Sequence, residues 1–418
     1  MINHRFHHKL KAGLLPLTLS ICLVLSIFCA ASILFAYYNN LLWIGAKTKS
    51  RVAMNVDSAL KYMLQSNLNG LSLGSEYGLD LFGEGRDSVR FTAKAWGIFD
   101  WLRIEAYDGR FVRSKDVIIG YQTQDRSSIA LYVSNNSPNS ITLVGDARIY
   151  GNAWVPQGGI KAGYFDREGY SGTRLIDGEI HASENRLLLF GNDVVIKIQK
   201  MIQLLGSVNQ GFGRSIPESL SNSFSNSCLT YFSDKSIFVS SHLDGNILII
   251  SQSDIIVNYS ADLDNVILVA PAIRFSSGFK GCLQAFATRE IVLEEGVVLK
   301  YPSALVVDSE RGGKVDILEN CQVNGLILSS CESDTEGLTR IAKSSVVNGQ
   351  VITTGKCSHQ GVINGQLFCK SLVIIDGSGE HLNFLKDGVV NRFGLSGQYL
   401  FLGILKEEKE RPRVLINL

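Results

Sequence analysis

The first hydrophobic feature of the chain is an unbroken apolar run close to its N-terminus. Residues 12–46 contain no charged side chain, and Leu14–Tyr38 exceeds the roughly 20 apolar residues that cross a bilayer. Tyr37 and Tyr38 end this run and Trp43 follows it, where interfacial aromatic residues are usual. A secretory signal has a core of only about 7–15 apolar residues. The run therefore predicts an uncleaved transmembrane helix over residues 14–44.

The charges beside this run predict its orientation. Arg5, Lys9 and Lys11 precede it without an acidic residue, and Lys47, Lys49 and Arg51 follow it. The flanking charges nearly balance and favour a cytoplasmic N-terminus only slightly. The shortness of the N-terminal stub, residues 1–13, favours the same orientation. We expect a single-pass inner-membrane protein whose bulk lies in the periplasm or outside the cell.

Helical periodicity continues beyond the apolar run. Apolar side chains recur three or four residues apart up to a stop signal at Asn67–Gly70, which predicts a helical stalk over residues 45–69. The stripe on this stalk is the candidate interaction surface, formed by Val52, Val56, Leu60, Met63 and Leu64. The layout resembles that of pilins, although Gly13 is not followed by the Glu of a prepilin cleavage site. Any single-pass protein with a helical stalk has the same pattern.

Short apolar runs separated by turn residues dominate the rest of the chain. They predict an antiparallel β unit over residues 88–190. Helical spacing at 193–205 and the Ser-rich stretch 221–227 predict a helix and linker within residues 191–230. A repeat unit over residues 231–376 and a C-terminal cap or tail over residues 377–418 complete the organisation.

The repeat consists of Asn-Gly or Asp-Gly pairs between apolar residues. The pairs are Asp244-Gly245, Asn324-Gly325, Asn348-Gly349 and Asn364-Gly365, with a related pair upstream at Asp177-Gly178. Several pairs lie inside apolar runs, which favours a parallel β-helix with Gly at close approaches and Asn pointing outward. The alternative is a β-sandwich in which Asn-Gly pairs form hairpin turns.

Two resemblances follow from these segments. Residues 278–307 and 151–164 resemble an uncharacterised family of single-pass envelope proteins from bacteria of the Bacteroidetes type. The Asn-Gly coils resemble bactofilins, polymer-forming β-helix proteins, over about a third of the chain. Neither resemblance implies a catalytic residue.

Composition agrees with a β-rich protein of several folded units. The chain has 418 residues, 40 Gly but 7 Pro, and a net charge of +1, so no basic surface for nucleic acid is expected. Six of the eight cysteines lie in the C-terminal half, without metal-binding spacing. Small core residues are the favoured reading, with Cys369 on an inward ladder, although up to three disulfides are the alternative.

Candidate chemistry is sparse. Asp254, Asp262 and Asp264, with Arg274, would form a carbohydrate-active site if the fold brought them together, and Glu294-Glu295 is a second acidic pair. The residues 70–74 match a GxSxG motif, but a stalk precedes it where a nucleophile elbow needs a strand. The histidines, including His4, His7 and His8, form no recognisable metal motif.

The sequence therefore predicts a mainly β envelope protein with an N-terminal transmembrane helix, a stalk, an antiparallel β unit and a β-helix. We expect a structural or scaffold role through contact with other envelope proteins, including pilin-like or secretion subunits, or with further copies. No catalytic, cofactor or metal residue is predicted. The alternative is a surface protein that binds or cleaves carbohydrate.

Overall fold

The computed structural model describes residues 14–66, 74–81, 83, 85, 88–122, 129–135, 138–185, 187, 190–207, 215–331, 337–405 and 412–418. The predicted stub 1–13 with its three histidines, the stop signal at 67–70 and most of the GxSxG motif lie outside these residues. The chain divides into two compact units. The first comprises Met1–Leu60, Gly78–Arg90 and Glu105–Ser114, and the second comprises Lys61–Tyr77, Phe91–Ile104 and Lys115–Leu418.

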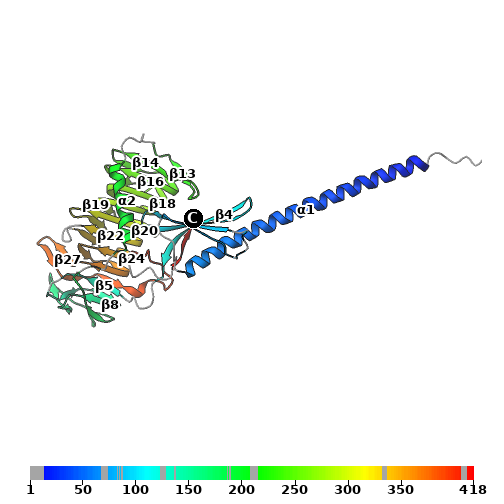
Figure 1. Cartoon of the computed structure of the whole chain (residues 1–418). Coiled ribbons are helices and arrows are strands. Elements are labelled where there is room, and N and C mark those ends of the chain that lie inside the picture. The colour runs from blue at the N-terminus through cyan, green and yellow to red at the C-terminus, as the bar shows by residue number, and fades with distance from the viewer. Residues whose placement is uncertain are drawn as a thin grey trace, which may run out of the picture. The chain divides into compact units, whose positions relative to one another are not determined.

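The predicted N-terminal helix is one unbroken element of 52 residues, α1 (Leu14–Gln65), about 78 Å long at 1.5 Å per residue (Figure 1). Its apolar part is exposed along Leu14–Ile44. By length and composition it is able to cross a membrane, with a mean hydropathy of 2.6 in its most apolar stretch and none of that stretch buried.

The C-terminal part of α1 differs because one side of it is buried. Val52, Val56, Leu60 and Met63 are 1%, 4%, 6% and 1% exposed, and Leu64 is half-buried. The periodicity thus identified the packing face of the helix correctly. As a candidate interaction surface the stripe is occupied by the protein itself and is not open to a partner in this structure.

An antiparallel sheet follows the helix. Its strand order is β1-β2-β3-β4-β31. The bounds are β1 Glu76–Leu79, β2 Ser88–Trp96, β3 Phe99–Asp108, β4 Phe111–Tyr121 and β31 Pro412–Asn417. The last strand of the chain pairs antiparallel with β4, so part of the predicted C-terminal tail belongs to this sheet.

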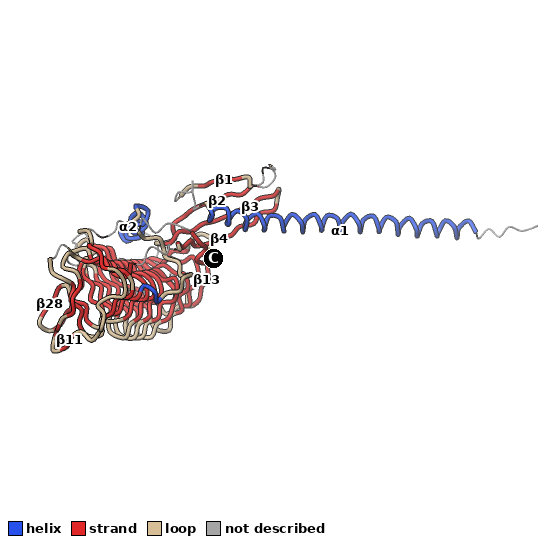
Figure 2. The backbone as a smooth tube through the Cα atoms, turned by 90° about the horizontal axis from the view of Figure 1, so that it is seen from below, coloured by secondary structure: helices blue, strands red, loops and turns tan. Residues whose placement is uncertain are grey.

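The remainder of the chain is mostly a parallel β-solenoid of about 11 turns, which confirms the β-helix and excludes the sandwich (Figure 2). Its central strands are β16 (His242–Ser251), β17 (Asp254–Val257), β18 (Asp262–Phe275), β19 (Lys280–Leu293), β20 (Val298–Ser309), β21 (Lys314–Ile317), β22 (Gln322–Cys331), β23 (Leu338–Ile341), β24 (Val346–Thr353), β25 (Lys356–His359), β26 (Val362–Cys369) and β27 (Ser371–Asp376). At one end lie β13 (Ser219–Asn222), β14 (Leu229–Ser233) and β15 (Ile237–Val239). Elsewhere lie β28 (Gly379–Leu382), β29 (Phe384–Lys386), β30 (Val389–Asn391), and the short 3-10 helix η1 (Arg392–Gly394).

The solenoid also contains strands that were predicted to be antiparallel. These are β5 (Ile129–Val133), β6 (Ile141–Val144), β7 (Arg148–Tyr150), β8 (Asn152–Val155), β9 (Ile160–Ala162) and β12 (Ile180–Ala182), with a small hairpin of β10 (Tyr164–Phe165) and β11 (Glu168–Gly169). β5 pairs parallel with β26, and β8 pairs parallel with both β5 and β12. The prediction of an antiparallel unit over residues 88–190 is therefore wrong beyond β4. The solenoid also extends beyond the predicted repeat unit at residues 231–376.

The chain thus builds its coils out of sequence order. After β12 it passes through α2 (Asn192–Ser207), which confirms the helix expected at 193–205. It then reaches β13 at the other end and winds back until β26 stacks on β5. The predicted Ser-rich linker at 221–227 forms part of the end coil, because Asn222 belongs to β13 and Phe224 is buried.

The Asn-Gly repeat forms two ladders across consecutive coils. Asn324, Asn348 and Asn364 lie in register. The side-chain amides of Asn348 and Asn364 each donate to the side-chain oxygen of the preceding Asn, at 2.8 and 2.9 Å. The glycines after them lie equally in register, at φ angles of +138° to +146°. Only Gly adopts this backbone readily, so the repeat is needed where coils approach one another most closely.

Apolar residues of the inward ladders form the solenoid core. All eight cysteines are free, and five of the six in the C-terminal half are buried, with Cys321, Cys357 and Cys369 in this core. The prediction of small core residues is therefore confirmed for these five and is wrong for Cys228, which is exposed. Burial raises the pKa of the Cys357 thiol to about 12, which keeps it protonated. A second apolar cluster covers the outer face of the long sheet with residues of α2, the β2–β3 turn and the segment 402–405.

His359 is buried between coils and predicts an acid-dependent loss of stability. Its Nε2 lies 3.0 Å from the Val389 carbonyl oxygen, and Nδ1 has no partner. Burial lowers the pKa of His359 from 6.5 to about 4. Between these values the unfolded chain binds a proton that the folded chain does not, so the free energy of unfolding falls as pH is lowered. The full difference is roughly 3 kcal/mol at about 1.4 kcal/mol per pH unit.

Denaturant unfolding in detergent at pH 7.5 and pH 4.5 measures this loss. The His359→Gln variant should lose roughly 2–3 kcal/mol less than the native chain between the two pH values. The same substitution at His242, whose side chain is 66% exposed, should leave the pH dependence of the native chain intact. Equal pH dependence in the native chain and His359→Gln would contradict the assignment.

Candidate functional site

A cleft of about 480 Å³ lies between the β2–β3 turn, α2 and the first coils of the solenoid. All of its lining residues belong to the second compact unit. A volume of this size lies within the range of small-molecule sites. Among the described residues, this cleft is the candidate functional site. The β2–β3 turn forms part of its wall, so the contacts that hold the turn come first.

The β2–β3 turn is held on the solenoid by Gln284, a fully buried residue of β19. Its Oε1 accepts from the Ile98 amide at 2.8 Å, and its Nε2 donates to the Trp96 carbonyl at 3.0 Å. Gly97 has a φ of +59°, and a Cβ there would lie 2.1 Å from Gln284 Oε1. The turn therefore requires glycine both for its backbone conformation and for the approach of Gln284.

A buried lysine joins the same turn to α2. Lys197 is 2% exposed, and its ammonium donates to the Ile98 carbonyl at 3.3 Å and to the Asp100 carboxylate. Asp193 lies one helical turn earlier, with 3.7 Å between its Oδ2 and Lys197 Nζ. Tyr121 donates to Asp100 at 3.0 Å, and burial, assisted by Asp100, raises the pKa of Tyr121 well above its usual value. These contacts hold α2, which contributes Met201 and Leu204 to the lining of the cleft, against the β2–β3 turn.

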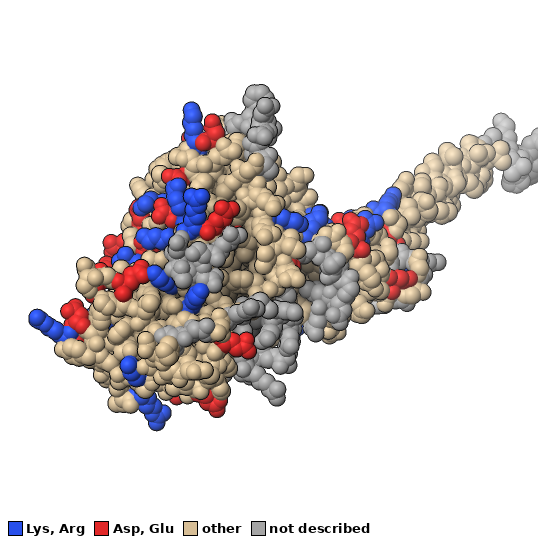
Figure 3. All heavy atoms as spheres, turned by 60° about the vertical axis from the view of Figure 1, so that its left-hand side comes forward, with Lys and Arg blue, Asp and Glu red and all other residues tan. Residues whose placement is uncertain are grey.

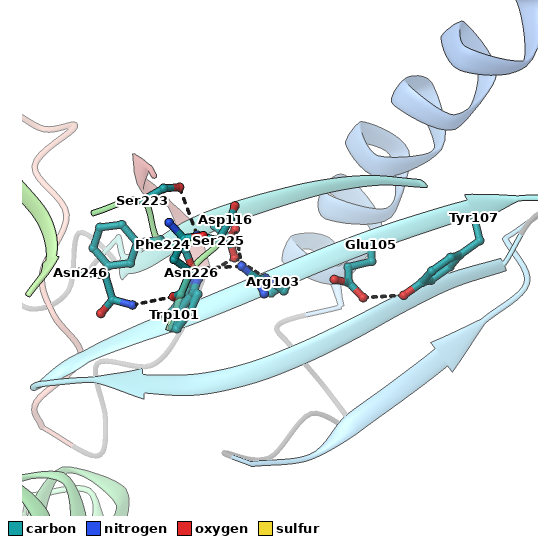
Figure 4. Close-up of polar contacts among 10 residues, drawn as sticks. All are labelled: Trp101, Arg103, Glu105, Tyr107, Asp116, Ser223, Phe224, Ser225, Asn226 and Asn246. Atoms are coloured by element: carbon teal, nitrogen blue, oxygen red, sulfur yellow. Dashed lines mark hydrogen bonds and ion pairs between the residues drawn. The ribbon is translucent and has the colours of Figure 1, made fainter. Parts of the chain in front are cut away.

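The opposite wall is aromatic and carries an ion pair (Figure 4). Arg103 donates to both carboxylate oxygens of Asp116, at 2.8 and 3.0 Å, and to the Phe224 carbonyl at 3.0 Å. Trp101 Nε1 donates to the same Asp116 at 2.9 Å. The ring of Phe224 meets those of Trp96 and Trp101 edge to face, at centroid distances of 4.9 and 5.9 Å. Arg103 thereby ties the loop after β13 to the antiparallel sheet.

Polar side chains also line the cleft. Asn246 donates to the Asn226 carbonyl at 3.1 Å, and Lys94 Nζ lies 5.6 Å from the centre of the Trp101 ring. The large aromatic rings are almost fully buried, at 5% for Trp96 and 9% for Trp101. Their faces are used in packing, so this arrangement serves to dock the sheet, helix and solenoid together rather than to present a stacking surface.

The acidic residues proposed for a carbohydrate-active site are not brought together. Asp254 lies in β17, where it pairs with Arg289 at 2.9 Å, and β17 pairs with the last residues of β18. Asp262 and Asp264 lie at the beginning of β18, and burial, together with Asp244, raises the pKa of Asp264. Glu294 and Glu295 are bound by Arg274 and Asn320. Among the described residues, no group of three metal-ligating side chains is present.

Sequence reasoning did not find the cleft. Its residues come from β2, β3, α2, the loop after β13 and the solenoid, so no local spacing connects them. The signal available in the sequence was the pair Trp96-Gly97, where an aromatic residue precedes a turn glycine. That pair alone predicts a turn and no partner for it.

Comparison with known proteins adds little to this description. No family model matches the chain, and no curated protein matches it. Among solved structures, the competence-associated pilin ComZ from Thermus thermophilus is similar, at 11% identity over 85% of this chain and 93% of that chain, with a TM-score of 0.27. A likeness at this TM-score carries no argument. The class of protein is defined by the chain itself, as a parallel β-solenoid with a long N-terminal apolar helix.

Proposed function

We propose that the chain is a membrane-anchored structural component of a bacterial cell envelope. The observation that carries the proposal is the continuity of α1. Its exposed apolar part, Leu14–Ile44, runs without a break into a part whose packing face is buried in the folded protein. An apolar helix exposed on all sides is stable in lipid or against other helices, and not in water.

This architecture favours a role in contact rather than catalysis. The cleft described above is lined by aromatic rings that pack against one another. The solenoid is stiffened by ladders of hydrogen bonds that repeat from coil to coil. We propose that the solenoid is held in the periplasm or outside the cell, where it meets other envelope proteins, including pilin-like or secretion subunits, or further copies.

Membrane extraction tests the anchor. The native chain should stay in the membrane pellet in high salt and in alkaline carbonate, and should be released by detergent. The double substitution Ile27→Asp and Leu34→Asp should release it, because an acidic residue in the middle of a membrane helix costs about 3 kcal/mol. Met54→Asp, at a position 62% exposed beyond the apolar run, is the matched control and should remain in the membrane. Release of the native chain by salt alone would contradict the anchor.

The same membranes test the contact part of the proposal. A photoreactive residue at Met54 points away from the buried stripe, whereas Leu60, at 6% exposure, does not reach a partner. Protein adducts at position 54, with further copies or with pilin-like or secretion subunits, support assembly through the helix. An anchored chain that yields no protein adduct in native membranes would exclude assembly through this part of α1.

A further inference from the structure

The turn between β3 and β4 lies beside α1, just beyond the end of the uncharged run. Arg51 pairs with the carboxylate of Asp108, and Lys49 Nζ lies 5.9 Å from the centre of the Phe111 ring. All four residues belong to the first compact unit. Ile44, the last residue of the exposed apolar stretch, is five positions before Lys49, or about 8 Å along the helix axis.

The surface around this turn is basic and carries an apolar side chain at its tip. Lys47, Lys49, Arg110, Val112 and Arg113 are all exposed, and we refer to them as the basic tip. Val112 is 55% exposed although it belongs to β4. The acidic residue at the turn, Asp108, is already paired with Arg51. In Figure 3 the uncharged part of α1 is tan on the face in view, and Lys and Arg side chains, with Asp and Glu nearby, begin at its C-terminal end.

The position of the basic tip along α1 determines what it can meet. Lys47 Nζ lies 5.1 Å from the centre of the Trp43 ring, and tryptophan at the end of an apolar helix sits at the level of lipid headgroups. Charges within about 8 Å of that level are inside one Debye length at physiological salt, so an anionic surface attracts them. Val112 lies between Arg110 and Arg113 in the sequence and is exposed like them, so a probe at its position reports what this surface meets.

We propose that the basic tip docks on anionic phospholipid headgroups of the membrane that α1 enters. This inference rests on the proposed anchor, and it adds a second point of attachment. One helix leaves the protein free to tilt and to rotate about the helix axis. Contact at the β3–β4 turn, to one side of α1, restricts both motions and orients the first compact unit on the membrane.

Photocrosslinking to lipid tests the docking with the full-length chain. The protein is reconstituted in vesicles of phosphatidylcholine alone or of phosphatidylcholine and phosphatidylglycerol at 3:1, with a photoreactive residue at Val112. Lipid adducts at position 112 should form in the anionic vesicles and fall at least threefold in the neutral ones. Arg110→Gln with Arg113→Gln should cause a similar fall, whereas Lys161→Gln with Lys235→Gln, at exposed solenoid positions, should not.

Two further probe positions separate failure of the docking from failure of the anchor. Phe35, 72% exposed in the apolar run, should label lipid in every vesicle and variant, and Phe238, 61% exposed on the solenoid, should label it in none. If lipid is labelled at Phe35 but not at Val112, the docking is overturned and the anchor remains. The same holds if labelling at Val112 does not depend on lipid charge. Loss of labelling at Phe35 as well would overturn both. Protein adducts at Val112 in native membranes, in place of lipid adducts, would assign the tip to a protein partner and overturn the inference.

Discussion

Gly349→Ala should unfold the centre of the solenoid, with a loss of about 4 kcal/mol or more in the free energy of unfolding. An added Cβ would lie 1.9 Å from the Gly325 carbonyl oxygen and 2.7 Å from the Tyr399 hydroxyl. The φ angle of +146° is strained for any residue with a side chain. Backbone atoms of the neighbouring coil cannot move aside, because Gly325 and Gly365 are held in the same ladder on both sides.

Denaturant unfolding in detergent measures this effect, and Gly377→Ala is the matched control. A Cβ at Gly377 meets no atom within 4 Å, and its φ angle is ordinary, so the substitution should change stability by less than about 0.5 kcal/mol. If Gly349→Ala were as stable as Gly377→Ala, the register of the glycine ladder would be wrong. Limited proteolysis adds a local readout, since the coils around β22, β24 and β26 should become the first sites of cleavage.

The glycine ladder also shows what the sequence was able to predict. Asn-Gly pairs inside apolar runs are unsuited to hairpin turns, and their spacings of 24 and 16 residues correspond to one coil each in the structure. A stacked coil repeats the same backbone conformation and the same amide ladder, so it leaves a trace in one sequence. The transmembrane run and the buried stripe of α1 were predictable for a similar reason, because both depend on spacing within one helix.

Strand direction and the docking of separate elements left no such trace. β5 and β8 have the short apolar runs of ordinary strands. β5 pairs with β26, more than two hundred residues later, and with β8, which runs parallel to it after a crossover. Periodicity of two residues is the same in parallel and antiparallel strands, so the pattern over residues 129–182 did not identify the partner. The Ser-rich stretch after residue 220 was misread because its polarity hid Phe224, a single buried anchor.

The same reasoning explains why the stripe was assigned to a partner. An amphipathic helix shows that one side is covered, and does not show by what. Val52 and Val56 are covered in the folded chain itself, which makes the stripe a determinant of how firmly the helix is joined to the protein. The stripe is therefore not available to the membrane. The sequence feature that predicts a membrane contact is the exposed pair Lys47 and Lys49, which follows the uncharged run.

Lys197→Met should detach α2 from the antiparallel sheet, at a cost of about 3–5 kcal/mol. The substitution keeps the apolar length of the side chain but removes the charge that pairs with Asp100 and the donor to the Ile98 carbonyl. The Ile98 carbonyl would lose this donor, and Asp100 would lose its cationic partner Lys197 while keeping the hydrogen bond from Tyr121. Hydrogen exchange should therefore accelerate over residues 192–207 and in the β2–β3 turn, together with the fall in overall stability.

Lys200→Met is the matched control, since it makes the same change three residues later on the exposed side of α2 and should shift stability by less than about 0.5 kcal/mol. A second variant, Lys197→Met with Asp100→Asn, also removes the carboxylate charge and should recover part of the loss, because a largely buried carboxylate deprived of the lysine costs more than a neutral amide. Recovery of this kind assigns the loss to the stranded charge. A double variant no more stable than Lys197→Met would show instead that the lysine acts through the Ile98 carbonyl and its own packing, and the junction between α2 and the sheet would then depend on the turn held by Gln284.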